Sequence, residues 1–94
     1  MQTKTNQKVV IRMSDKSVEE TCIEFIRESL RLDADKVITP ETNIIEELEG
    51  DSLDVIEIVI DIEENYDINI LEEELVNVRF VKDLILLVEE AIAE

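Results

Sequence analysis

The chain has 94 residues, enough for one small domain, and its 25 acidic and 9 basic residues give a formal net charge of −16. It contains one cysteine, one glycine and no histidine, which excludes an internal disulfide, glycine-rich phosphate loops and imidazole-based catalysis. No Lys or Arg lies between Val37 and Val78, where 14 residues are acidic; this distribution argues against binding to nucleic acid or an anionic membrane and favours a positively charged protein partner.

Residues 1–16 are polar and mildly basic, and we expect them to form a flexible N-terminal extension in front of a single domain at residues 17–94. A remnant of a targeting peptide is the alternative, although the segment lacks the Arg and Ser enrichment of such peptides. The sequence shows no secretory signal and no apolar run approaching the roughly 20 residues of a membrane span. We therefore expect a cytoplasmic protein that does not enter a membrane.

A first helix is predicted to begin after Ser17 and to end near Arg31 and Leu32. Ser17 and Glu20 have the spacing of a capping box, in which each side chain accepts a hydrogen bond from the other residue's backbone N–H. Cys22 lies on the apolar side of this helix and is predicted to be a small buried core residue. The apolar side consists of Val18, Cys22, Ile23, Ile26 and Leu30, with Phe25 beside them.

Residues 33–50 form a long connection, and Thr39-Pro40 breaks any helix at that point. In a compact domain a connection of this length needs apolar anchors, and a short helical turn within residues 40–48 would help to order it. The predicted anchors are Val37, Ile38, Ile44, Ile45 and Leu48.

The stretch Gly50-Asp51-Ser52 is predicted to open a second helix over residues 52–66. Gly50 allows a turn at little steric cost, and Asp51 is a suitable N-cap for the first backbone amides. Asp54 adds a negative charge in the first turn, where the helix dipole favours it. One face of the helix, placed at about 100° per residue, is wide enough to pack on a core. That face consists of Val55, Ile58, Val59, Ile62 and Tyr66.

The same helix has a second, narrow apolar stripe, made by Leu53, Ile56 and Ile60 on nearly the opposite side. A stripe bordered by carboxylates is typical of a docking surface, where apolar anchors and charges orient a basic partner. The alternative is that another helix of the same domain covers the stripe. The carboxylates are Asp54, Glu57, Asp61 and Glu64 on one flank and Glu63 near the other.

The rest of the chain is predicted to contain one short and one long helix. An extended step at residues 67–70 precedes one or two helical turns at residues 72–76. Asn77 is the predicted cap for a last helix that starts at about Arg79 or Phe80 and ends at Ala91. The pattern is therefore all-α, with three main helices and one short helix. The last helix is predicted to bury Val81, Leu84, Ile85, Val88 and Ile92 and to leave Leu86 and Leu87 partly exposed.

Ser52 is the candidate functional residue, because its hydroxyl is expected at the positive end of the second helix, where backbone amides favour a phosphate ester. The alternative is that Ser52 only caps the helix. No histidine and no nearby lysine can activate this hydroxyl, which excludes a Ser-His-Asp hydrolase. The acidic stretches that begin at Asp51 and Asp61 lack the glycine of an EF-hand loop. We expect neither an enzyme nor a metal site, and a function that depends on a covalently attached group.

The chain resembles the acyl carrier protein family over two stretches, LEGDSLDVIEIV at residues 48–59 and IEENYDINI at residues 62–70, and more loosely over residues 17–92. The resemblance implies a four-helix bundle with a long first loop. It also implies that Ser52, flanked by Asp51 and Leu53, receives 4′-phosphopantetheine from coenzyme A through a phosphopantetheinyl transferase. The terminal thiol of this arm would hold acyl chains as thioesters and deliver them to successive enzymes.

The same resemblance implies two further sets of residues in a carrier expected to be a monomer. Acyl chains would be sheltered inside the bundle, and the candidates for the lining are Ile58, Ile62 and Ile70. Partner enzymes with basic docking patches would bind the second helix at Asp54, Ile56, Glu57, Ile60, Asp61 and Glu64.

Several positions depart from the family pattern. Leu48-Glu49-Gly50 stands where the family commonly has Leu-Gly-Ala or Leu-Gly-Met, so the glycine is displaced by one position. Leu71 replaces a common proline, and Arg79 replaces a common threonine at the start of the last helix. Three functions stay open: a carrier in type II fatty acid biosynthesis, a specialised carrier for a polyketide or secondary-lipid pathway, and an acidic helical interaction module without a prosthetic group.

Overall fold

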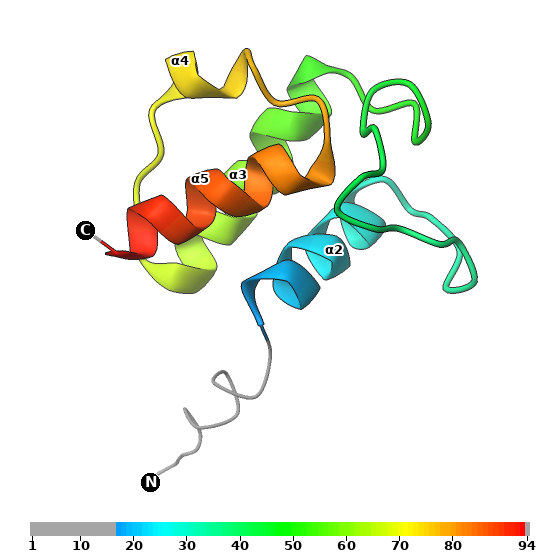
Figure 1. The fold of residues 1–94 in the computed structure, drawn as a ribbon, viewed down its shortest axis with the longest axis horizontal. Coiled ribbons are helices and arrows are strands. Elements are labelled where there is room, and N and C mark those ends of the chain that lie inside the picture. The colour runs from blue at the N-terminus through cyan, green and yellow to red at the C-terminus, as the bar shows by residue number, and fades with distance from the viewer. Residues whose placement is uncertain (1–16, 94) are drawn as a thin grey trace, which may run out of the picture.

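The computed structural model describes residues 17–93, and this part of the chain is all-α, as predicted. Its helices are α2 (Val18–Ser29), α3 (Ser52–Tyr66), α4 (Glu72–Leu75) and α5 (Val81–Ala93). The helix α2 packs against both α3 and α5, and α4 packs against α3. Figure 1 shows the short α4 at the top left and the connection between α2 and α3 on the right-hand side. The predicted extension at residues 1–16 lies outside the described residues, as does Glu94.

The helix α2 begins with the predicted capping box. The Ser17 hydroxyl accepts a hydrogen bond from the Glu20 N–H at 3.1 Å, and the Glu20 carboxylate accepts one from the Ser17 N–H at 3.2 Å. The helix ends at Ser29, two residues before the predicted end at Arg31. Arg31 has a positive φ of 56°, a left-handed backbone that cannot continue a right-handed helix.

The long connection between α2 and α3 is tied to the start of α5 by backbone hydrogen bonds. The Ile44 N–H donates to the Arg79 carbonyl at 2.7 Å. The Val81 N–H donates to the Thr42 carbonyl at 3.0 Å, and the Lys82 N–H donates to the Pro40 carbonyl at 2.9 Å. Nearer to α2, the Arg27 guanidinium donates to three loop carbonyls, those of Asp33, Ala34 and Lys36, at 2.6, 3.3 and 2.9 Å.

Most of the predicted loop anchors are confirmed. Ile38, Ile44 and Leu48 are buried, and Ile45 is half-buried. Val37 was predicted wrongly, because its side chain is 76 % exposed, whereas its neighbour Ile38 is buried. The helical turn within residues 40–48 is limited to one hydrogen bond of helical spacing, from the Glu47 N–H to the Asn43 carbonyl at 2.9 Å.

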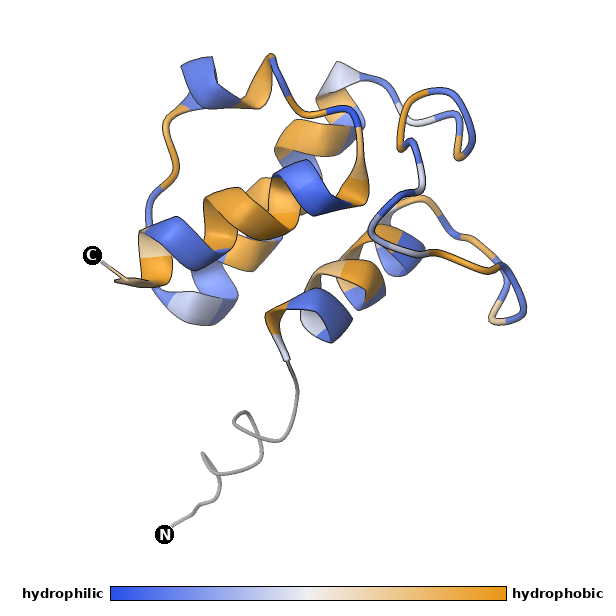
Figure 2. Cartoon of the chain, in the orientation of Figure 1, coloured by the Kyte–Doolittle hydropathy of each residue, from blue (hydrophilic) through white to orange (hydrophobic). Residues whose placement is uncertain are grey.

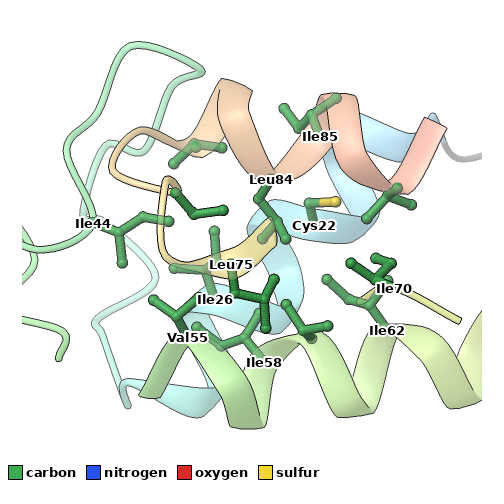
Figure 3. Packing of buried hydrophobic residues seen from close by; sticks show 14 of the residues in the cluster. Cys22, Ile26, Ile44, Val55, Ile58, Ile62, Ile70, Leu75, Leu84 and Ile85 are labelled. Carbon is green, nitrogen blue, oxygen red and sulfur yellow. The ribbon is translucent and has the colours of Figure 1, made fainter. Parts of the chain in front are cut away.

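Apolar side chains from all four helices and from the connection form one core. In Figure 3, Val55, Ile58 and Ile62 point from α3 toward residues of the other helices, among them Ile26 and Leu75. The predicted core face of α3 is confirmed, with Tyr66 only half-buried at its end. Hydrophobic segments dominate α3 and α5, whereas α4 begins with hydrophilic residues (Figure 2).

The last helix, α5, starts and ends about two residues later than predicted and is capped differently. The Asp83 carboxylate accepts hydrogen bonds from the backbone N–H groups of Arg79 and Phe80 at 3.1 and 3.0 Å, so Asn77 is not the cap. Ile92 was also predicted wrongly: it is 43 % exposed, because it lies one turn beyond Val88, the last fully buried residue of this helix. The other predictions for this helix are confirmed, with Val81, Leu84, Ile85 and Val88 buried, Leu86 exposed and Leu87 half-buried.

Cys22 is fully buried, as predicted. Burial, and to a lesser extent the negative charge of Glu89, raises the pKa of its thiol to about 12. We expect native protein to be inert to a thiol reagent at about pH 8 and denatured protein to react at once, because only the thiolate attacks. The unfolded thiol ionises near its ordinary pKa of about 8.5, so this group destabilises the fold as the pH rises from about 9 to 12. Absorbance after addition of a disulfide reagent, with and without urea, measures the first effect. Rapid labelling of the native protein would contradict the burial of Cys22.

Candidate functional site

The N-terminus of α3 is closed by two carboxylates. The Asp51 carboxylate accepts a hydrogen bond from the Asp54 N–H at 3.0 Å, and the Asp54 carboxylate accepts one from the Asp51 N–H at 3.0 Å. Asp51 is therefore the N-cap, as predicted, and Asp54 completes a capping box. Ser52 is the first helical residue, and its side chain is exposed.

The Ser52 hydroxyl has no hydrogen-bond partner among residues 17–93. The alternative interpretation, in which Ser52 only caps the helix, is therefore wrong, because Asp51 already fills that role. An exposed hydroxyl without a partner is accessible to an enzyme that modifies it. It is not activated from within the described part of the chain, where no side chain accepts its proton.

The turn before Ser52 is made by a different residue than predicted. The positive φ of 62° belongs to Glu49, and Gly50 has a negative φ. Gly50 is instead required by close packing: its N–H donates to the Ile44 carbonyl at 3.0 Å, and a Cβ at this position would lie 3.2 Å from the Ile44 Cγ2 and 3.3 Å from the Ile44 carbonyl oxygen. Glu49 occupies the place where the family pattern has glycine, so the chain has a strained residue there.

We expect Glu49→Gly to stabilise the protein by about 0.5–1 kcal/mol, because glycine adopts a left-handed backbone without the strain of a Cβ, although its unfolded chain gains entropy. Gly50→Ala is the matched control in the same turn, and it should destabilise the protein because its Cβ crowds Ile44. Urea unfolding of both variants and wild type measures the two effects. A stability loss for Glu49→Gly would show that the left-handed turn carries no strain.

A groove of about 330 Å³ lies beside Ser52, and we call it the Ser52 groove. Its lining comes from α3, from the connection before it, and from α4 and the segment that follows α4. Its interior includes the buried apolar residues Val55, Leu75 and Val78, and charged Glu72 and Arg79 also line it. The full lining is Ile45, Ser52, Val55, Ile56, Glu72, Leu75, Val76, Val78 and Arg79.

The second apolar stripe of α3 is not covered by another helix of residues 17–93. Leu53 is 68 % exposed, Ile60 is 46 % exposed, and Ile56 is half-buried because it also lines the Ser52 groove. The alternative of an internal helix over this stripe is therefore wrong. Of the predicted docking carboxylates, Glu57, Asp61 and Glu64 are exposed, and Asp54 is half-buried because it completes the capping box.

Glu63, which lies near the other flank of the stripe, has a structural role. Its carboxylate accepts a hydrogen bond from the Ile70 N–H at 2.7 Å and so holds the segment that follows α3. Asp67 ends α3 with a left-handed φ of 58°. The backbone of Asp67 thus turns the chain out of α3, and the Glu63 hydrogen bond ties Ile70, near the start of α4, back to α3.

The three candidates for an acyl-chain lining lie on the inner side of the bundle. Ile58 and Ile62 are fully buried in the core, and Ile70 is 9 % exposed (Figure 3). Ile70 also lines a second groove of about 330 Å³, between the segment at Asn69–Glu74 and α5 at Leu87.

Sequence reasoning missed most of the Ser52 groove. Its far wall comes from Leu75, Val78 and Arg79, which are distant from Ser52 in the sequence and carry no motif of their own. Arg79 offered one signal, because it is the first cation after Lys36 and it interrupts a long acidic stretch.

The protein-family model described as the phosphopantetheine attachment site matches residues 23–88 of this chain. The match covers most of the chain and includes all or part of each described helix. An acyl carrier protein from Akkermansia muciniphila is 40 % identical over 78 residues, which cover 83 % of this chain and 96 % of that protein. The chain belongs to the acyl carrier protein family. As a member of this family it is a carrier and not an enzyme, and the prosthetic group of the family is a covalently attached 4′-phosphopantetheine.

Solved structures agree with this family assignment. The acyl carrier protein of Thermotoga maritima is 33 % identical and superposes with a TM-score of 0.65, over 77 % of this acyl carrier protein and 82 % of that chain. A proposed acyl carrier protein of Mycobacterium tuberculosis is 27 % identical, with a TM-score of 0.71 over 79 % of this chain and 97 % of that one. The predicted bundle with a long first loop is thereby confirmed. None of the described helices is both long and apolar enough to cross a membrane.

The residues of this acyl carrier protein fit the prosthetic group of the family. The group needs a hydroxyl on which it can be attached, and Ser52 presents one that is exposed and unpaired within the described residues. The rest of the group consists of a phosphate and a flexible chain with amides and a terminal thiol, and it needs a protein surface against which it can pack. The Ser52 groove offers an apolar floor with one carboxylate and one guanidinium beside it.

Proposed function

We propose that this acyl carrier protein carries acyl intermediates as thioesters on a 4′-phosphopantetheine arm attached to Ser52, in type II fatty acid biosynthesis. The observation that supports Ser52 as the attachment site is its exposed, unpaired hydroxyl on the first residue of α3, at the mouth of a groove. Asp51 supports the site by capping the helix, and Leu53 is exposed beside it as a contact for the modifying enzyme.

Attachment forms a bond between the Ser52 Oγ and the phosphorus of the arm, while the nucleotide part of coenzyme A leaves and the serine proton is removed. The base must come from the phosphopantetheinyl transferase, because this chain has no histidine and no carboxylate of residues 17–93 is hydrogen-bonded to the hydroxyl. What this chain supplies is a rigid first turn of α3 that presents the oxygen in one place.

Partner enzymes with basic patches are proposed to dock on the exposed stripe of α3. Leu53 and Ile60 provide apolar anchors, and Glu57, Asp61 and Glu64 provide the charges that orient the partner. Asp54 and Ile56 contribute less area, since both are half-buried. The transferase, acyl-transferring enzymes and chain-elongating enzymes would use this surface in turn.

Acyl chains are proposed to enter the bundle from the Ser52 groove between Val55 and Leu75. From there a chain would reach Ile58 and then Ile62, which lie one and two turns further along α3. Both side chains are fully buried in this structure, so we expect an entering acyl chain to make room by separating α4 from α3. Ile70, at the second groove, would lie at the far end of this path.

A specialised carrier for a polyketide or secondary-lipid pathway is the second candidate function. The observation that favours it is the position of two departures from the family pattern: Arg79 lines the Ser52 groove, and Leu71 lines the second groove and is 61 % exposed. Both change the surface that a cargo or a partner meets. The third hypothesis, an interaction module without a prosthetic group, is not supported, because the proteins of this family carry a prosthetic group.

Intact mass spectrometry tests the proposed attachment site. Purified protein is incubated with coenzyme A and a broad-specificity phosphopantetheinyl transferase, and the adduct is mapped on proteolytic peptides. We expect one phosphopantetheine per chain, on the peptide that contains Ser52 and not on the one that contains Ser29. A folded protein that gains no adduct, or gains it on another residue, would refute the proposal. Loading with a panel of acyl groups would then separate the two pathways.

A further inference from the structure

The Ser52 groove contains a cation that the attachment chemistry does not use. Arg79 lines this groove together with Ser52, although the two residues lie far apart in the sequence. The charged groups beside Ser52 are anionic, because Asp51 and Asp54 cap the helix that Ser52 begins, and Glu72 lines the same groove. Arg79 is therefore the one cation among the residues that line the groove.

The backbone of Arg79 is held on both sides. Its carbonyl accepts a hydrogen bond from the Ile44 N–H at 2.7 Å, and its N–H donates to the Asp83 carboxylate at 3.1 Å. The residue is exposed, and its guanidinium is paired with no side chain of residues 17–93. Lys82, the next cation along the chain, lies 5.6 Å from the centre of the Phe80 ring and does not line the groove.

A fixed backbone with an unpaired guanidinium is suited to hold an anion. Guanidinium groups bind phosphate oxygens through two parallel N–H donors, which fixes direction as well as distance. The phosphate that would link the arm to Ser52 carries one negative charge and would otherwise face carboxylates on α3. An arginine in the same groove offsets that repulsion.

We propose that Arg79 is a positioning residue that binds the phosphate of the arm on Ser52 and directs the arm along the Ser52 groove toward Leu75. This inference rests on the proposed attachment at Ser52. It gives a role to the one cation of the groove in a strongly acidic chain, and it gives the phosphate a partner from the segment that precedes α5.

The test compares unloaded and loaded forms of wild type, Arg79→Gln and Lys82→Gln. Each loaded form is first verified by intact mass, and the melting temperature of both forms is then measured at low salt. The quantity of interest is the gap between the loaded and unloaded forms of one variant, because it cancels the effect of the substitution on the fold. An exposed ion pair in a domain of this size shifts a melting temperature by about 1–5 °C.

We expect the gap to fall by about that amount in Arg79→Gln and to stay at the wild-type value in Lys82→Gln, which removes the same charge outside the groove. The ³¹P resonance of the arm should also move in Arg79→Gln and not in Lys82→Gln. Equal gaps and unmoved resonances in all three proteins would overturn the inference while leaving the proposed function intact. An equal loss in both variants would overturn it too, because net charge alone would then explain the effect. A wild-type protein that cannot be loaded would refute the attachment at Ser52 and the inference with it.

Discussion

A Ser52→Ala protein is expected to accept no phosphopantetheine and to carry no acyl chain, yet to keep the wild-type free energy of unfolding within about 0.5 kcal/mol. The loss should be complete because, in the proposed function, the arm is joined to the Ser52 hydroxyl oxygen. The fold should be unaffected because the Ser52 hydroxyl makes no hydrogen bond within residues 17–93 and alanine is the better helix former. Intact mass after incubation with the transferase, and urea unfolding of the same sample, measure the two quantities.

Asp51→Ala is the matched control for this variant, one residue earlier in the same turn. It removes the side chain that caps α3 and should cost about 0.5–2 kcal/mol of stability. Its serine hydroxyl stays in place, so it should still be loaded. A Ser52→Ala protein that is loaded, or that loses as much stability as Asp51→Ala, would contradict the roles given to these two residues.

The second large effect is expected from reversing two charges on the exposed stripe of α3. In Glu57→Lys/Asp61→Lys the partner's basic patch would meet like charges, and the affinity for a transferase that loads wild-type protein should fall about 10- to 100-fold. The dependence of the dissociation constant on salt should flatten, because the attraction that salt screens has been removed. Calorimetric titration at low and high salt measures both.

Glu89→Lys/Glu90→Lys on α5 is the control for net charge. These two residues are also exposed, and the double substitution changes the charge of the chain by the same amount. Its affinity should stay within a few-fold of wild type. Equal weakening by the two double variants would mean that the whole charge of the molecule attracts the partner and that α3 has no special part in it.

The elements that could be predicted from the sequence are those fixed by neighbours along the chain. The bounds of α3 were predicted correctly because Asp51 and Asp54 define its start and the spacing of Val55, Ile58 and Ile62 defines its inner face. The capping box of α2 was found for the same reason. The cap of α5 was missed because Asn77 is a preferred capping residue by type, whereas Asp83 accepts the backbone hydrogen bonds from within the first turn of the helix.

Features that depend on distant parts of the chain could not be predicted. The exposure of Leu53 and Ile60 depends on where every other helix packs, so a helical wheel left two interpretations open. The Ser52 groove is built from segments that meet only in the folded chain, and periodicity contains no information on such meetings. The left-handed backbone of Glu49 was missed for a local reason, because the adjacent Gly50 is the residue type that favours a turn.

The hydrogen bonds between the connection and the start of α5 give the Ser52 groove two walls of unequal stiffness. On one side, backbone hydrogen bonds join Ile44 to Arg79 and Val81 to Thr42, so the connection and the start of α5 are held together. On the other side, α4 is a single turn of four residues whose N-cap makes no side-chain hydrogen bond and whose first turn is three adjacent glutamates. Local opening is cheapest where buried contacts and hydrogen bonds are fewest. We therefore expect the groove to widen by displacement of α4 while the connection and α5 stay together, so that an acyl chain of growing length would enter without moving the turn that presents Ser52.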